Sequence, residues 1–162
     1  MPYTINMPFG KEIPLVFDSP HSGFIFPIEF KSCASLDALK SGCDWYVDEL
    51  WRDALKYGAT ILAASFPRAF IDPNRAVTDV DLGLIEGQWT RDIKPTDYSK
   101  RGMGLIRRYA LPSQPMYNGK LLASEVYKRI DQYYLPYRQM LDSLLKEKKM
   151  SLVVFIMLTV IL

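Results

Sequence analysis

The hydrophobic positions of the chain predict buried strands alternating with amphipathic helices. One short apolar run covers residues 13–17 and is followed by Asp18-Ser19-Pro20, and a second covers Ala59–Phe66. Short apolar runs bounded by turn-forming residues are typical of buried strands, and a proline biases the residue before it towards extended geometry. Both runs are therefore expected to be strands.

Residues 44–57, between these runs, have the periodicity of a helix. Apolar side chains recur at positions 47, 50, 51, 54 and 55, which is the spacing of one helix face, and Gly58 follows where a C-cap is expected. A strand, a helix and a strand in this order predict a parallel crossover connection.

The second half of the chain predicts a long irregular segment, a long helix and a last strand. Residues 78–101 are polar and contain glycine and proline, whereas residues 104–108 could form a short strand. Helical spacing runs from Lys120 to Lys146, and Pro136 must kink or split that helix. The apolar residues 151–162 are too few for a membrane span, which needs roughly 20 residues, so a buried strand is expected. The whole pattern predicts an α/β sandwich.

Composition and charge narrow the possible functions. A chain of 162 residues is expected to form a single domain, and its 20 basic and 18 acidic residues are largely scattered, so no nucleic-acid partner is predicted. Cys33 and Cys43 form neither a CxxC pair nor a disulfide framework, and no signal-peptide pattern opens the chain. Reduced thiols in a cytoplasmic protein, with no membrane partner, are therefore expected.

The one histidine of the chain, His21, lies in the sequence SPHSG directly after the first predicted strand. Ligands of open α/β sheets gather at the carboxyl ends of strands, so this position favours a functional role. A metal ligand, a catalytic base and a structural histidine all remain possible from its position alone.

Asp44 and Asp48 form an acidic pair four residues apart at the start of the predicted helix. One interpretation is that Asp44 caps the helix and Asp48 interacts with the helix dipole. Because two like charges at this spacing repel each other, the alternative is a bound cation, with zinc as a candidate.

The stretch FPRAFIDPNR, residues 66–75, places two arginines around the end of the second predicted strand. Guanidinium groups match carboxylates through two parallel hydrogen bonds, so Arg68, Asn74 and Arg75 suit a substrate that bears carboxylates. The alternative is a structural loop in which Asp72 pairs with Arg68 or Arg75 and Asn74 makes a turn.

Taken together, SPHSG, DWYVDEL, FPRAFIDPNR and YYLPYRQML resemble the N-formylglutamate amidohydrolase family. The four blocks follow the order of the family and span nearly the whole chain. The resemblance implies a three-layer sandwich with a mixed, mostly parallel sheet, similar to zinc exopeptidases. It also implies zinc-dependent hydrolysis of an N-acyl amino acid, most simply N-formyl-L-glutamate to formate and glutamate, in histidine degradation.

The resemblance also implies roles for residues of this chain. His21 would be a zinc ligand, and the carboxylate ligand would come from the acidic pair, with Asp48 preferred over Asp44. Arg75, with Asn74 beside it, would anchor a small-molecule carboxylate substrate, and Arg68 would be a second cation near it.

Family members continue into a strand that ends in Asp-Cys-His-Ser, whose histidine supplies a further ligand, whereas this chain has no second histidine. With a suitable choice of codons, residues 158–162 can be read in another frame as Asp-Cys-His-Ser. We therefore hypothesise a frameshift near the lysine-rich residues 146–149. The chain would then be the N-terminal portion of such an enzyme, with the general base in the missing part. The alternatives are an amidohydrolase for another N-acyl amino acid or peptide, a non-catalytic remnant, and a protein with a membrane tail.

Overall fold

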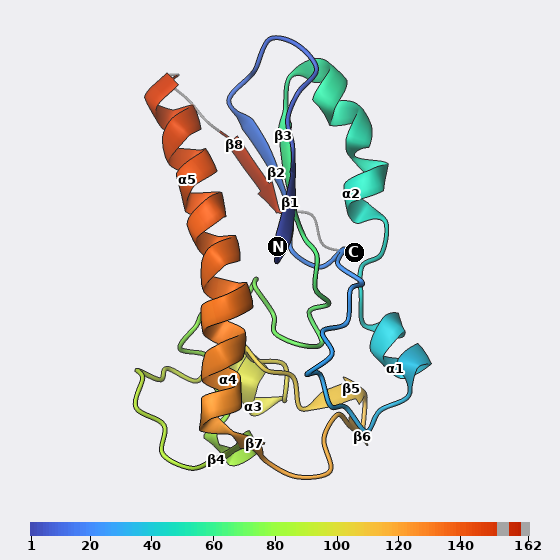
Figure 1. The fold of residues 1–162 in the computed structure, drawn as a ribbon, viewed down its shortest axis with the longest axis vertical. Helices are drawn as coiled ribbons and strands as arrows, with labels where there is room; N and C mark the ends of the chain where they lie inside the picture. The colour runs from blue at the N-terminus through green and yellow to red at the C-terminus, as the bar shows by residue number, and fades with distance from the viewer. Residues whose placement is uncertain (152–155, 160–162) are drawn as a thin grey trace.

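A four-stranded sheet forms the centre of the fold in the computed structural model, which describes residues 1–151 and 156–159 (Figure 1). The strands lie in the order β1 (Tyr3–Asn6), β3 (Thr60–Ala64), β2 (Leu15–Ser19) and β8 (Ile156–Thr159). β2 is parallel to both β3 and β8, and β1 is antiparallel to β3. The predicted α/β fold with a mixed, mostly parallel sheet is confirmed.

Helical segments cover both faces of this sheet. Consecutive residues of a strand point to opposite faces, so neighbouring residues of β2 pack in different hydrophobic clusters. Val16 of β2 and Leu62 of β3 belong to the large hydrophobic core that also contains Tyr137 of the long helix. Phe17 of β2 packs in a second, smaller cluster with Leu55. Figure 1 shows the corresponding layers, with α5 on one side of the sheet and α2 on the other.

The segment between β2 and β3 is more broken than its periodicity predicts. It contains α1 (Leu36–Ser41), α2 (Val47–Leu50) and the 3-10 helix η1 (Arg52–Tyr57). Tyr46 precedes α2 in the left-handed region, with φ of 63°, so Asp44 lies outside the helix and does not cap it. A single helix over residues 44–57 is therefore wrong, although η1 does end at Gly58, as predicted, with φ of 94°.

The connection from β3 to the long helix is mostly irregular, as predicted for residues 78–101. Its short elements are η2 (Leu82–Leu84), β4 (Ile85–Glu86), α3 (Asp97–Lys100), β5 (Tyr109–Leu111), β6 (Gln114–Pro115) and β7 (Leu121–Leu122). The strand predicted at residues 104–108 is wrong. Met103 and Arg107 form an isolated bridge there, which closes a turn just before β5.

The predicted long helix is continuous but changes its winding before Pro136. It consists of α4 (Ala123–Arg129), the π-helical turn η3 (Ile130–Tyr134) and α5 (Leu135–Ser151). The N–H of Leu135 donates to the carbonyl of Ile130, five residues back. Proline lacks an N–H and its ring crowds the preceding turn, and the wider π turn accommodates both effects. The predicted disruption at Pro136 therefore takes the form of a π turn.

The last predicted strand is confirmed for Ile156–Thr159, which pairs with β2 as β8. Ser151 still belongs to α5, and the rest of the predicted strand lies outside the described residues. Within the described part of the chain, no helix has the length and apolar character needed to cross a membrane.

Candidate active site

The loop SPHSG places His21 just beyond the carboxyl end of β2, where it is only 2% exposed. The carbonyl of His21 accepts a hydrogen bond of 3.1 Å from the N–H of Asp44. A Cβ atom at Gly23 would stand 2.3 Å from the carbonyl oxygen of Phe66, so only glycine allows this close approach to the segment after β3. The loop is thus held between the segments that carry Asp44 and Arg68.

Asp72 fixes one side of the His21 ring. Its Oδ1 lies 2.8 Å from Nε2 of His21 and also accepts the N–H of Asn74 at 3.0 Å. Burial raises the pKa of Asp72, but the hydrogen bond and charge of His21, the Asn74 N–H and Arg75 outweigh it, so the pKa is lowered. Because an ionised carboxylate only accepts hydrogen bonds, this network assigns the proton of His21 to Nε2.

The other ring nitrogen faces a carboxylate and a guanidinium group. Nδ1 of His21 lies 3.2 Å from Oδ2 of Asp44, and one terminal nitrogen of Arg68 lies 3.0 Å from Nδ1 and 3.4 Å from the same Oδ2. A guanidinium group can only donate, so Nδ1 is an acceptor here. Two acceptor atoms, one nitrogen and one oxygen, therefore converge on a single cationic group.

This pair of acceptors fits part of a zinc site. Tetrahedral zinc with ligands at about 2.0–2.2 Å places neighbouring ligand atoms about 3.3 Å apart, close to the separation of His21 Nδ1 and Asp44 Oδ2. Asp72 on the opposite nitrogen is the type of partner that orients a metal-binding histidine. Among the described residues, however, no group of three His, Cys, Asp or Glu residues is arranged to hold a metal. His21 and Asp44 would thus supply two of the three protein ligands that a catalytic zinc usually has.

The geometry favours Asp44 over Asp48 as the carboxylate at this site, which reverses the preference that the family resemblance implies. Asp48 lies half-buried in the first turn of α2, whereas Asp44 is held by the backbone of His21. The left-handed Tyr46 between them breaks the helix, so the two carboxylates do not share one helical ridge. The assumed spacing of four residues on a helix therefore does not apply.

The loop after β3 positions the other predicted substrate-binding residues. Nε of Arg75 donates to the carbonyl of Met103 at 3.0 Å, and its guanidinium carbon lies 3.8 Å from the ring centroid of Tyr98. Asn74 follows Asp72 in a turn closed by its own N–H on the Asp72 side chain, which confirms the predicted turn. The side chain of Asp72 hydrogen-bonds to His21. The alternative interpretation, in which Asp72 pairs with Arg68 or Arg75, therefore does not describe its hydrogen bonds.

The sequence interpretation missed Arg107, which lies in the turn closed by the bridge to Met103. The Nε atoms of Arg68 and Arg107 are both buried without a hydrogen-bond partner among the described residues. Arg107 directly follows the apolar residues Leu105 and Ile106 and lies 86 residues after His21, so no local pattern connects the two residues. Only the folded arrangement of the two loops relates them.

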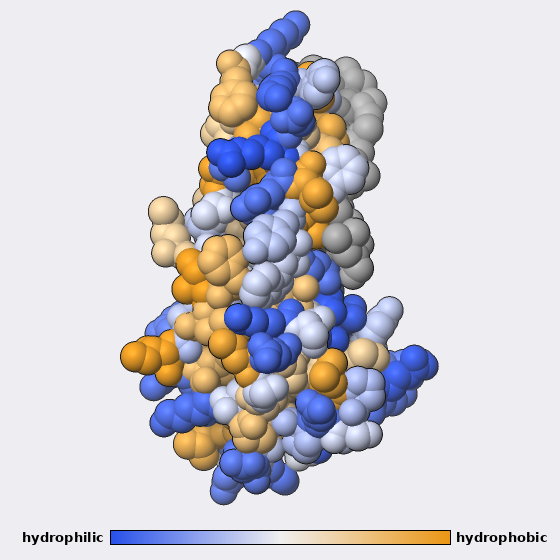
Figure 2. Space-filling model, turned by 90° about the vertical axis from the view of Figure 1, so that its right-hand side faces the viewer, coloured by the Kyte–Doolittle hydropathy of each residue, from blue (hydrophilic) through white to orange (hydrophobic). Residues whose placement is uncertain are grey.

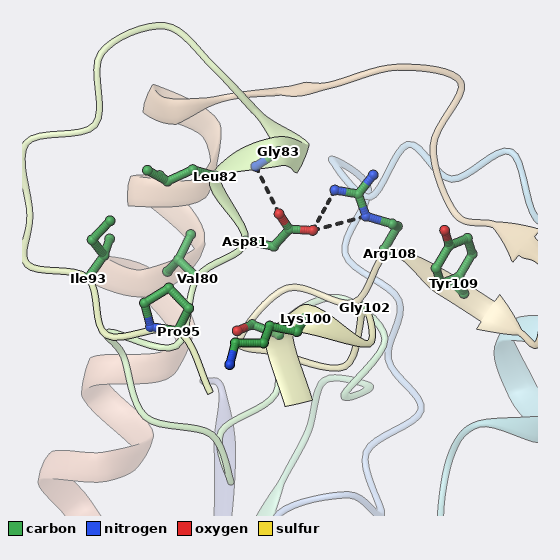
Figure 3. Close-up of a pocket in the computed structure, with 11 residues that line it drawn as sticks. Val80, Asp81, Leu82, Gly83, Ile93, Pro95, Lys100, Gly102, Arg108 and Tyr109 are labelled. Carbon is green, nitrogen blue, oxygen red and sulfur yellow. Dashed lines mark hydrogen bonds and ion pairs between the residues drawn. The ribbon is translucent and has the colours of Figure 1, made fainter. Parts of the chain in front are cut away.

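Two other cavities are poor candidates for the same chemistry. One, of about 520 Å³, is lined by residues that include Asp81 and Arg108, but Asp81 accepts hydrogen bonds from both Gly83 and Arg108, so these polar groups satisfy one another (Figure 3). The other, of about 390 Å³, is an apolar groove that includes Phe17 and Trp51. On the molecular face shown in Figure 2, hydrophobic and hydrophilic residues are interspersed.

Comparisons with known proteins support the resemblance noted in the sequence. A family model described as N-formylglutamate amidohydrolase matches residues 13–160. The crystal structure of N-formylglutamate amidohydrolase from Ralstonia eutropha JMP134 is similar, with a TM-score of 0.94 and 37% sequence identity. The alignment covers 98% of this chain and 56% of that one, so this chain spans about half the length of that enzyme. A search of curated proteins found no match.

Proposed function

The chain belongs to the N-formylglutamate amidohydrolase family, and from this premise we propose that it acts in the hydrolysis of N-formyl-L-glutamate to formate and L-glutamate. The observation that carries the proposal is the environment of His21. Its Nε2 is bound by Asp72, while its Nδ1 and the Asp44 carboxylate face the same cationic group. This arrangement suits a metal-dependent hydrolase better than a structural histidine.

Zinc is the cofactor that we propose, with His21 Nδ1 and Asp44 as the residues that would hold it. When bound, zinc would polarise the formyl carbonyl and lower the pKa of a coordinated water to about 7. Asp72 keeps the proton of His21 on Nε2, so that Nδ1 remains available as a ligand. We assign neither a third ligand nor the general base to the described residues.

The arginines would bind and orient the substrate. Arg75 is fixed by the Met103 carbonyl and the Tyr98 ring, so its guanidinium group is preorganised to hold a carboxylate, with Asn74 beside it. In the structure a terminal nitrogen of Arg68 occupies the place between His21 Nδ1 and Asp44 where zinc would bind. With zinc bound, the guanidinium group would have to lie beside the metal, close to where a carbonyl oxygen would become negative during hydrolysis. We assign Arg68 to charge stabilisation at that position, in addition to substrate binding.

We further propose the finer features that the family resemblance implies. These are a three-layer, zinc-exopeptidase-like architecture, a role in histidine degradation and a cytoplasmic location. Helical segments on both faces of the sheet support the first, and the free thiols of Cys33 and Cys43 support the last.

A second candidate function follows from the incomplete set of metal ligands. With two converging ligand atoms, the described residues suit a chain that binds carboxylates and zinc without completing hydrolysis. An amidohydrolase for a different N-acyl amino acid would share the same arginines, because these recognise a carboxylate and not the acyl group.

The test is an assay of formate release by the purified chain with added zinc, using N-formyl-L-glutamate and a panel of other N-acyl amino acids. We expect release to be fastest with N-formyl-L-glutamate and to be abolished by His21→Gln. Stoichiometric zinc without formate release would favour the binding function. Activity that survives His21→Gln would contradict the proposed site.

A further inference from the structure

Arg107 lies beside the residues proposed to bind substrate. The carbonyl of Met103, its bridge partner, accepts the Nε hydrogen bond of Arg75. The carbonyl of Leu105, in the same turn, accepts the N–H of Asp72 at 2.9 Å. The turn that carries Arg107 is therefore tied by hydrogen bonds to the loop that carries Asp72 and Arg75.

The guanidinium group of Arg107 also reaches the segment that carries Asp44. One of its terminal nitrogens lies 3.2 Å from where a Cβ atom of Gly42 would stand, two residues before Asp44. Burial lowers the pKa of Arg107, and the positive charges of Arg68 and Arg75 lower it further, against the opposing effect of Asp72. Arg107 therefore lies near the positive charges of Arg68 and Arg75, which the carboxylate of Asp72 only partly offsets.

The neighbouring residue, Arg108, shows that the Nε of an arginine in this segment can have a carboxylate partner. Nε of Arg108 donates to Asp81 at 3.0 Å, as Figure 3 shows. Nε of Arg107, in contrast, is buried and has no hydrogen-bond partner among the described residues. A buried donor that lacks a partner is costly and calls for an explanation, such as a ligand that accepts its hydrogen bond.

A cavity large enough for such a ligand opens next to Arg107. It has a volume of about 590 Å³, within the roughly 300–1,000 Å³ typical of small-molecule sites. Arg101 and Arg107 are the charged residues among those that line it, and none of the lining residues is acidic. The cavity is thus suited to an anion.

We propose that Arg107 determines specificity by binding the side-chain carboxylate of an acidic N-acyl amino acid, while Arg75 and Asn74 hold the other carboxylate. This assignment rests on the proposed function, because it names the part of the substrate that the cavity would accept. The planar guanidinium group can bind such a carboxylate through two parallel hydrogen bonds. The amide of the corresponding glutamine substrate cannot accept both of them.

The experiment compares N-formyl-L-glutamate with N-formyl-L-glutamine, by calorimetric binding and by formate release, in the presence of zinc. We expect the wild-type chain to prefer the glutamate compound, and Arg107→Gln to weaken its binding about 10–100-fold while changing that of the glutamine compound little. Arg107→Lys keeps the charge and should restore part of the preference. Arg108→Gln is the matched control, and it should leave the preference intact.

The outcomes separate this assignment from the proposed function. If formate is released but the preference survives Arg107→Gln, the assignment is overturned and the proposed function stands. If the preference is lost with Arg107→Gln and no variant releases formate, the assignment is supported and the proposed hydrolysis fails. Equal binding of both compounds by the wild-type chain overturns the assignment. Thermal unfolding of each variant shows whether it is folded. If Arg107→Gln is misfolded, the preference of Arg107→Lys between the glutamate and glutamine compounds decides instead.

Discussion

Asp72 does not touch the position proposed for the metal, yet the chemistry of His21 depends on it. A histidine ring has two tautomers, and only the one with its proton on Nε2 presents a lone pair at Nδ1. The carboxylate of Asp72, 2.8 Å from Nε2, stabilises that tautomer and fixes the plane of the ring. Because the pKa of Asp72 is lowered, this carboxylate remains ionised at neutral pH.

We predict that Asp72→Asn weakens zinc binding about 10–100-fold. The asparagine is nearly the same size, but it is uncharged and its amide group can also donate to Nε2, which would favour the wrong tautomer of His21. Competition with a fluorescent zinc chelator at neutral pH measures the affinity.

Asp48→Asn is the matched control, since it removes a carboxylate of the same acidic pair without touching His21. Its zinc affinity should equal that of the wild-type chain, whereas Asp44→Asn should lose affinity. A loss with Asp48→Asn alone would reverse the assignment of the carboxylate ligand.

The sequence could predict some of these side chains but not their contacts. His21, Arg68 and Arg75 stand out because they are histidine or arginine next to predicted strand ends. The contact between His21 and Asp72 spans 51 residues, and a periodic pattern carries no information on such a pairing. The family resemblance favours Asp48 over Asp44, whereas the left-handed residue Tyr46, which no periodic pattern indicates, separates the two and Asp44 is the one that faces His21.

The loop after β2 packs closely against the end of β3 and the residues that follow it, at Gly23. We predict that Gly23→Ala lowers the free energy of unfolding by about 1–3 kcal/mol, since its Cβ would stand 2.3 Å from the Phe66 carbonyl oxygen and the backbone must move. His21 is two residues away, so zinc affinity should fall as well. Urea unfolding and the zinc competition assay measure the two effects.

Gly119→Ala provides the comparison for this change, because a Cβ there has no heavy atom within 4 Å. It should leave both quantities near the wild-type values. Equal stability of the two alanine variants would mean that the loop is not held as tightly as its contacts indicate.

The end of α4 is fixed to the core by a buried arginine. Arg129 is 1% exposed, and it donates to the carbonyl of Phe70 at 2.9 Å and to the hydroxyl of Tyr117 at 2.8 Å. Its guanidinium carbon also lies 4.4 Å from the ring centroid of Phe70. One side chain thus connects the long helix to the loop that carries Asp72 and Arg75.

We predict that Arg129→Met lowers the free energy of unfolding by about 2–3 kcal/mol, because the Phe70 carbonyl and Tyr117 would lose a buried charged donor. Urea denaturation provides the measurement. The adjacent, exposed Lys128→Met should change stability by less than about 0.5 kcal/mol. Similar losses in both variants would argue against a specific role for Arg129.

The elements that the sequence predicted best are those buried on both sides. β3 and residues 15–17 of β2 are almost entirely apolar, as expected for strands of a sheet that helical segments cover on both faces. β1 was missed because its residues alternate between half-buried and exposed at the edge of the sheet, in a segment of only four residues. Residues 104–108, where a strand is expected, form a turn instead, and both backbone groups of Leu105 bond to other loops, its N–H to Asp79 and its carbonyl to Asp72.

The position of β8 connects the end of the described chain with the site. β2 carries His21 at its carboxyl end and lies between β3 and β8. Val16, Phe17, Asp18 and Ser19 of β2 are all buried, so this strand lacks the prolines and the exposed charged side chains that protect natural edge strands. Pairing of residues 15–18 with residues 156–159 therefore covers a backbone that is poorly suited to be an edge.

We predict that deleting residues 152–162 lowers stability and promotes self-association, because β2 would lose the hydrogen bonds of β8 and become an edge strand. Urea unfolding and sedimentation velocity measure the two effects. Deleting only residues 160–162 leaves β8 in place and should change neither. If both deletions behave like the full chain, the β2–β8 pairing contributes little to stability. If only the longer deletion is destabilised and also loses zinc affinity, the sheet edge and the His21 site are coupled through β2.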